Sequence, residues 1–110
     1  MTLINLTPHE VVLVTANTTH RLPPAAHPAR IIDTAGPAAA AADLPIPVRQ
    51  RLLTDNIDGL PGAADGVYYV VSRAIAMVAV NRADLLVPGP LHTLSDGKLG
   101  CTELLQFTTH

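Results

Sequence analysis

A chain of 110 residues with a formal net charge of -2 has the size of a single domain and no general attraction for polyanions. With two Tyr, one Phe and no Trp, it also lacks the aromatic side chains on which bases stack, so we expect no nucleic acid polymer as a partner. Apolar residues make up 48% of the sequence and charged residues 15%, whereas disordered chains have few apolar residues and a high net charge, so we expect this chain to fold.

The mean hydropathy of +0.31 is high for a domain that has little interior in which to bury apolar surface. We therefore expect a homo-oligomer. No apolar run reaches the roughly 18 residues of a membrane span, and the amino terminus has neither the basic region nor the long apolar stretch of a signal peptide. These features predict a cytoplasmic protein with no membrane partner.

Two runs near the amino terminus, residues 3–6 and 10–15, are rich in Val, Ile, Leu and Thr and predict two short strands. They are separated by Pro8, which cannot donate a ladder hydrogen bond. Residues 16–19 have the composition of a turn, and residues 29–33 predict a further strand.

The middle of the chain is rich in Ala and Pro. Residues 34–45 are bounded by Gly and Pro and have no apolar period, so we expect a flexible surface loop there, within a single domain of residues 1–110. Residues 46–53 alternate between two faces, one of which carries Ile46, Val48 and Leu52. This alternation predicts a half-buried strand.

Residues 67–72 predict the central strand of the fold, because β-branched and aromatic residues occupy both of its faces. The alanines that follow favour a short buried helix over residues 73–80, with Ser72 as its N-cap and Asn81 at its end.

Residues 84–87 and 91–94 predict two short strands, and Asp96-Gly97 is a hairpin signal that leads into residues 98–107. The sum is an α+β fold that is mainly β. We expect a small antiparallel sheet or a partly open β-barrel with one short helix packed against it.

Motifs for catalysis, metals and cofactors are not found. The five histidines lack the spacing of a helical zinc site, the single Cys101 excludes a multi-cysteine site, and no Gly-rich phosphate loop is present, so we expect no metal and no cofactor. Ser72 lacks the flanking glycines of a nucleophile elbow, and a lone Cys101 in a strand is expected to be a buried hydrophobe. We therefore assign no catalytic residue and consider an enzyme less favoured.

Polar residues at the ends of predicted apolar elements are candidates for a site that holds a small anion. Guanidinium groups bind phosphate or carboxylate in a bidentate manner, and the start of a helix at Ser72-Arg73 adds backbone donors. Tyr68 and Tyr69 point to opposite faces of a strand, so one can be core while the other, Tyr69, stacks on a base. The predicted ligand-binding residues are Thr7, His9, Arg30, Tyr69, Ser72, Arg73, Arg82 and Asp84.

The arginines allow another interpretation, in which they form ordinary surface ion pairs, Arg82 with Asp84 and Arg30 with Asp33 or a neighbour. Such pairs contribute at most about 1 kcal/mol. If Arg82 instead binds the ligand, Arg82→Ala should weaken binding by about 1–3 kcal/mol.

The segment from Ile4 to Val11 contains the motif Asn-Leu-Thr-Pro-His and resembles the start of a family of small proteins from bacteriophages, prophages and actinobacteria. Further matches are Pro23-Pro24 with Ala29-Arg30-Ile31, Gly59-Leu60-Pro61, Tyr69-Val70-Val71-Ser72, Arg82-Ala83-Asp84 with Pro88-Gly89, and Leu99-Gly100-Cys101. Family members usually carry Ser-Gly where this chain has Ala25-Ala26-His27-Pro28, so no ligand contact of that loop is carried over.

The resemblance implies a similar fold. By analogy with small phage proteins that sequester nucleotide signals of host defence, it also implies a compact, oligomeric and non-catalytic binder. Our leading hypothesis is therefore a binding domain for a small anionic, nucleotide-like ligand. One alternative is an interaction or structural protein of phage or prophage origin, and another is a small hydrolase or transferase that uses His9 with Ser72 or Cys101.

Overall fold

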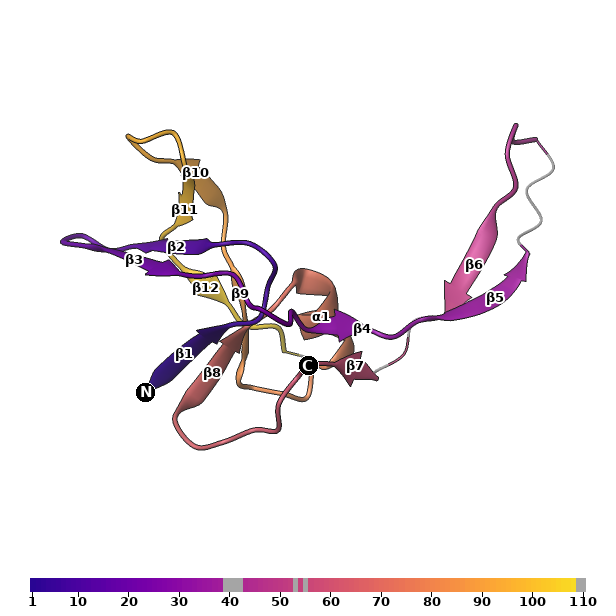
Figure 1. Cartoon of the computed structure of the whole chain (residues 1–110), viewed down its shortest axis with the longest axis horizontal. Helices are drawn as coiled ribbons and strands as arrows, with labels where there is room; N and C mark the ends of the chain where they lie inside the picture. Colours follow the sequence, from indigo (N-terminus) through magenta and orange to yellow (C-terminus); the bar gives the residue numbers. More distant parts are fainter. Residues whose placement is uncertain (39–42, 53, 55, 109–110) are drawn as a thin grey trace.

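The computed structural model describes residues 1–38, 43–52, 54 and 56–108, and this part of the chain is mainly β with one short helix (Figure 1). The elements in chain order are β1 (Thr2–Asn5), β2 (Val11–Val14), β3 (Thr19–Leu22), β4 (Arg30–Ile31), β5 (Thr34–Ala38), β6 (Arg49–Leu52), β7 (Ile57–Asp58), β8 (Val67–Val70), α1 (Arg73–Val78), β9 (Leu85–Pro88), β10 (Leu91–Thr93), β11 (Leu99–Cys101) and β12 (Leu104–Leu105).

Two four-stranded sheets form the body of the molecule, in the orders β1-β8-β9-β12 and β10-β11-β2-β3. The first sheet is mixed, because β1, β8 and β9 run parallel while β12 is antiparallel to β9. The second sheet is antiparallel except where β11 pairs in parallel with β2. The expected α+β, mainly β class is therefore confirmed, but the two larger sheets are mixed rather than purely antiparallel, and the described residues form separate small sheets without a closed barrel.

The predicted central strand and helix are both present, but each is shorter than expected: β8 ends at Val70 instead of residue 72, and α1 ends at Val78 with Ala79 as its C-cap instead of reaching Asn81. Within α1, Ile75 and Ala76 are the buried residues, so the helix is partly rather than wholly buried. β8 is an inner strand, and Tyr69 and Val70, which point to opposite faces, are 5% and 0% exposed. The following α1 begins as predicted, because the Ser72 hydroxyl oxygen accepts a hydrogen bond from the Ile75 amide. The crossover through α1 places β9 beside β8 in parallel, an arrangement that a hairpin cannot produce.

The Asp96-Gly97 hairpin is also confirmed. Gly97 has a φ angle of 83°, a backbone conformation that residues other than glycine rarely adopt. The strands on either side of the turn, β10 and β11, pair antiparallel. The run predicted over residues 98–107 is divided into β11 and β12.

Strand predictions between residues 16 and 53 are less accurate. The turn predicted over residues 16–19 is present between Thr15 and Thr18, where the Thr15 amide donates to the Thr18 carbonyl oxygen at 2.8 Å. The strand that follows it, β3, was not predicted, and the strand expected over residues 29–33 is reduced to β4. Five residues of the expected loop, Thr34–Ala38, form β5, while residues 39–42 lie outside the described residues. The strand expected to be half-buried, β6, is exposed at all four positions.

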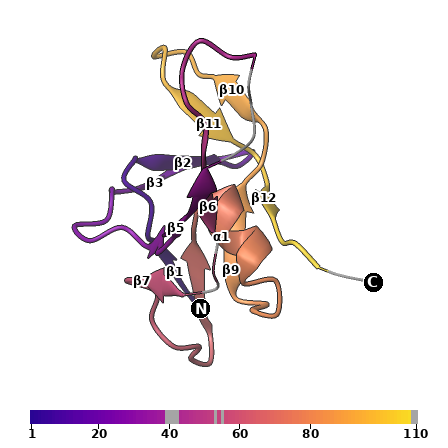
Figure 2. The same cartoon turned by 90° about the vertical axis from the view of Figure 1, so that its right-hand side faces the viewer.

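β5 and β6 together form a two-stranded ribbon that projects from the two larger sheets (Figures 1 and 2). The molecule consequently measures 55 × 35 × 33 Å, and its Cα radius of gyration is 17.0 Å. A compact domain of this length would have a radius of about 13 Å. The ribbon therefore lies outside the compact body.

The hydrophobic core lies between the first sheet and α1. It is built from side chains of the strands, the helix and three connecting segments: Leu6, Ala29, Tyr69, Val71, Ile75, Ala76, Leu85 and Val87. Burial of such side chains contributes about 25 cal/mol per Å² of apolar surface removed from water, which makes this cluster the main stabilising element.

Asn5 is a buried polar residue, 7% exposed, that connects three segments of the body. Its Nδ2 donates to the carbonyl oxygens of His9 at 2.8 Å and Pro23 at 3.0 Å, with a longer 3.4 Å contact to Leu22. Its Oδ1 accepts from the amide and the hydroxyl of Thr7, at 2.9 and 2.7 Å. The first residues of the Asn-Leu-Thr-Pro-His motif thus have a structural role.

Asn5→Ala should lower the free energy of unfolding by about 2–4 kcal/mol, because it leaves buried carbonyl and amide groups without partners. Urea denaturation checks this, with Asn17→Ala in an exposed turn as the matched control. Equal stability of the two variants would contradict the structural role of Asn5.

Candidate functional site

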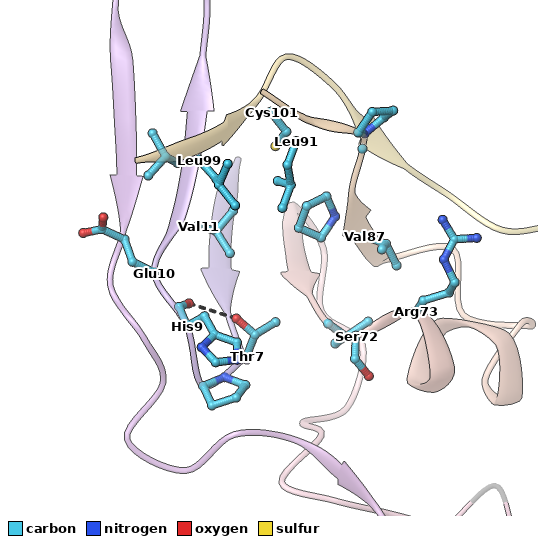
Figure 3. Close-up of a pocket in the computed structure, with 16 residues that line it drawn as sticks. Thr7, His9, Glu10, Val11, Ser72, Arg73, Val87, Leu91, Leu99 and Cys101 are labelled. Atoms are coloured by element: carbon cyan, nitrogen blue, oxygen red, sulfur yellow. Dashed lines mark hydrogen bonds between the residues drawn. The ribbon is translucent and has the colours of Figure 1, made fainter. Parts of the chain in front are cut away.

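A groove of about 880 Å³ opens between the two four-stranded sheets and is the candidate binding site (Figure 3). Its lining residues come from the β1–β2 connection and β2, from the β8–α1 connection and the start of α1, and from β9, β10, the connection between them and β11. They are Thr7, Pro8, His9, Glu10, Val11, Val12, Val71, Ser72, Arg73, Val87, Pro88, Gly89, Pro90, Leu91, Leu99 and Cys101. Most of this lining is apolar.

The parallel strands explain why these segments meet. Asn5, Val70 and Leu86 are neighbours across β1, β8 and β9, so the residues that follow each strand leave the sheet at the same edge. Ligand sites in sheets with parallel strands typically lie beyond the carboxyl ends of those strands. The groove occupies this position.

Gly89 permits the close approach that shapes one wall of the groove. Its amide donates to the carbonyl oxygen of Glu103 at 2.9 Å. A Cβ on residue 89 would lie 2.9 Å from the same oxygen, closer than side chains tolerate. Gly89 therefore keeps β9 and the β11–β12 connection together.

Four of the eight predicted ligand residues line the groove, namely Thr7, His9, Ser72 and Arg73. Figure 3 shows Thr7, His9 and Ser72 near one end and Leu91, Leu99 and Cys101 near the other. The first three belong to connections that follow β1 and β8, so the structure brings together residues that are about 65 positions apart in the sequence, as the prediction required.

Two of these four residues already have local partners. The Thr7 hydroxyl lies 2.7 Å from Asn5 Oδ1 and 3.0 Å from the His9 carbonyl oxygen, so its single hydrogen is shared between these two acceptors and fixes the turn. The Ser72 hydroxyl caps α1 but can still donate its hydrogen. Thr7 therefore shapes the groove, whereas Ser72 remains able to donate to a ligand.

His9 and Arg73 carry the cationic or titratable groups of the site. Both side chains are exposed, and within the described residues no ion pair involves either of them. The Arg73 guanidinium lies 5.1 Å from the centre of the Phe107 ring, a cation–π contact that holds it beside β12. A charge stabilised by an aromatic face can still bind a carboxylate or phosphate with its outer N–H groups.

The other four predicted residues lie elsewhere. Arg82 donates to Asp84 through Nε at 2.8 Å and Nη2 at 2.7 Å, a bidentate pair, and Nη2 also donates to the Pro61 carbonyl oxygen at 3.0 Å. The Arg82 guanidinium therefore donates to groups of the protein itself. Arg82 lines a separate, smaller hollow of about 390 Å³. The ion-pair interpretation of Arg82 and Asp84 is thus confirmed.

Arg30 and Tyr69 also lie outside the groove. Arg30 forms an ion pair, as the alternative interpretation expected, but its partner is Asp58 at 3.8 Å, while Asp33, one of the partners considered, bonds to Arg51 at 2.7 Å. Tyr69 is 5% exposed in the core, so the predicted stacking of a base on its ring does not fit this structure.

Residues that the sequence did not single out make most of the groove. Val11, Val87, Leu91 and Leu99 supply its apolar walls, and Glu10 adds a carboxylate that pairs with Arg21 at 3.1 Å. No local sequence signal identified them, because their proximity depends on parallel pairing between distant strands.

The residues of the catalytic alternative share the groove but do not form a catalytic pair. Within the described residues, no hydrogen bond joins the His9 side chain to Ser72 or Cys101. Cys101 is 1% exposed, and burial raises the pKa of its thiol, which disfavours the reactive thiolate.

The described residues contain no group of three or more His, Cys, Asp or Glu side chains that could hold a metal ion. Among the same residues, no helix is both long and apolar enough to cross a membrane.

Asp84→Asn should lower the free energy of unfolding at pH 7 by about 1 kcal/mol. The Arg82 guanidinium holds the pKa of Asp84 below its ordinary value of 3.8, so the pair stabilises the fold above that value and the stabilisation is lost as pH falls through the lower, folded-state pKa. Urea titrations of wild type and variant should therefore converge in acid. Asp65→Asn, in an exposed loop, is the control, and a pH-independent difference would contradict the ion-pair account.

Cys101 should react slowly with a thiol reagent such as Ellman's reagent in the native protein. The same thiol should react rapidly in denaturant, and the native reaction should begin at higher pH than for a free cysteine because burial raises its pKa. Rapid native labelling near neutral pH would instead support a nucleophilic role.

No protein-family model, curated protein or solved structure matches the chain. The resemblance of its first residues to the phage and actinobacterial family therefore stays a prediction.

Proposed function

We propose that the protein is a non-enzymatic binding domain whose groove holds a small amphipathic anion. The observation that supports this most directly is the combination of apolar walls with Arg73, His9 and Ser72 at the margin of one groove. Small-molecule sites are usually concave, mostly apolar and provided with a few polar groups that orient the ligand. The groove volume of about 880 Å³ lies within the usual range of about 300–1,000 Å³.

The apolar walls favour a ligand with a sizeable non-polar body. Leu91 and Leu99 are 55% and 53% exposed and would lose solvent contact when a ligand covers them. This burial contributes binding free energy at about 25 cal/mol per Å² of apolar surface.

The polar groups favour a single negative charge on the ligand. Arg73 offers outer guanidinium N–H groups, Ser72 a hydroxyl, and His9 an imidazole that bonds to an acceptor or a donor. Arg82 and Arg30 add no charge here, because each pairs with a carboxylate outside the groove.

A nucleotide is one member of this ligand class, since it combines a flat base with phosphate. Its base would contact aliphatic side chains such as Val11 and Val87 rather than Tyr69. The narrower proposal, that the protein sequesters a nucleotide signal of host defence, depends on the phage resemblance and on analogy.

A second candidate, an interaction or structural protein, is favoured by a different feature. Leu52 on β6, and Leu44 and Ile46 in the segment before it, are exposed apolar side chains that do not line the groove, and groups of such side chains can mark contacts with proteins.

The anionic naphthalene dye ANS is a suitable probe, because it has an apolar body and one sulfonate. Arg73→Gln should weaken ANS binding by about tenfold, as expected when a charge-assisted hydrogen bond of about 1.5 kcal/mol is lost, and Leu91→Gln should also weaken it. Fluorescence titration measures both effects. Arg49→Gln, which removes an exposed arginine on the ribbon, is the matched control.

Unchanged ANS affinity in Arg73→Gln would remove Arg73 from the site. Displacement of ANS by cyclic or ADP-ribose-type nucleotides, with the nucleotide mass unaltered in native mass spectrometry, would support non-enzymatic nucleotide binding. A changed nucleotide mass would point to an enzyme.

A further inference from the structure

One wall of the groove carries a carboxylate, although the groove is proposed to hold an anion. Glu10 is a lining residue and lies between the turn at Thr7 and His9 and the start of β2. Like charges repel, and they repel more strongly beside a protein wall than in bulk water. The proposed ligand therefore binds more favourably when the charge of Glu10 is compensated and directed away from it.

Arg21 compensates the charge of Glu10 at the shortest distance. Its Nη1 donates a hydrogen bond to Glu10 Oε1 at 3.1 Å, whereas Lys98 Nζ lies 3.9 Å from the same oxygen. The Glu10 carboxylate is directed away from Thr7 and Ser72, toward the outer side of the groove wall (Figure 3). The hydrogen bond from Arg21 holds it in that position.

The other branch of the guanidinium has a fixed anchor. Arg21 Nη2 donates to Asp96 Oδ2 at 3.1 Å, and Asp96 Oδ1 accepts a hydrogen bond from the Lys98 amide at 3.0 Å. Asp96 belongs to the turn between β10 and β11, while Arg21 belongs to β3. A planar guanidinium with N–H groups in fixed directions is suited to hold two carboxylates at once. Arg21 therefore has little freedom to leave Glu10.

Arg21 itself is not among the residues that line the groove. It lies opposite Val12 in the pairing of β2 and β3, and its side chain is 41% exposed. Exposed ion pairs contribute little to folding stability. The consequence of losing Arg21 should consequently appear in the affinity for a charged ligand rather than in the fold.

We propose that Arg21 is a specificity-determining residue of the groove, which favours an anionic ligand by neutralising Glu10 and holding its carboxylate away from the bound charge. This inference rests on the proposed function, in which the groove binds a small amphipathic anion. Arg21 acts through Glu10 and is a positioning residue, whereas Arg73 faces the ligand directly.

Two dyes that differ in one charge test the proposal. Arg21→Gln should weaken binding of the anionic dye ANS about threefold, because the Glu10 carboxylate is then uncompensated and free to turn toward the ligand. Binding of phenylnaphthylamine, which has the same rings without the sulfonate, should not change. Fluorescence titration at low ionic strength measures both affinities, since salt screens exposed charges. Arg51→Gln, which removes an arginine from an ion pair on the ribbon, is the matched control and should affect neither dye.

The double variant Glu10→Gln/Arg21→Gln separates charge compensation from a purely structural role. It removes both charges of the pair, so the ANS affinity should return to the wild-type value. If Arg21 only braced the β10–β11 turn, the double variant would bind as weakly as Arg21→Gln, and both dyes would be affected alike. Either result would overturn the proposal, as would unchanged ANS affinity in Arg21→Gln.

Arg73→Gln distinguishes failure of this inference from failure of the proposed function. If Arg73→Gln weakens ANS binding and Arg21→Gln does not, the groove binds anions but Arg21 does not contribute to that preference. If wild type does not bind ANS, or if neither substitution weakens its binding, the proposed function and the role of Arg21 are both wrong.

Discussion

The carboxamide of Asn5 fixes the arrangement on which the rest of the body depends. It joins the end of β1 to the turn at Thr7 and His9 and to the chain after β3, so that the first strands of both sheets are held at one point. Adjacent backbone bonds complete this junction, from the Leu6 amide to the Val70 carbonyl oxygen and from the Ala29 amide to the Leu6 carbonyl oxygen. The Asn5 carboxamide is buried and depends on its own hydrogen-bond partners, because an unsatisfied buried polar group costs about 1–3 kcal/mol.

The same junction opens the groove. Because β1, β8 and β9 are parallel, their carboxyl ends share one edge, and the bonds of Asn5 turn the chain across that edge before β2 begins. The walls are then supplied by residues that follow three different strands, together with Leu99 and Cys101 from β11. The hollow that results is largely apolar, and Arg73 lies among its lining residues.

The arginines of the chain differ in how their positive charges are partnered. Arg82 and Arg51 each bond to a carboxylate, and the paired charges raise the pKa of each guanidinium and lower those of Asp84 and Asp33. Arg73 pairs with an aromatic ring, which leaves its positive charge uncompensated at the groove.

The sequence by itself determined the features that depend on neighbouring residues: β8 from its β-branched and aromatic run, the start of α1 from Ser72, and the β10–β11 hairpin from Asp96-Gly97. Half of the predicted ligand residues line one groove, because polar residues cluster where strands end. Only the tertiary structure decided the rest. Parallel pairing, the burial of Tyr69 and the exposure of β6 all depend on contacts between distant segments, and local propensity does not encode which strands become neighbours.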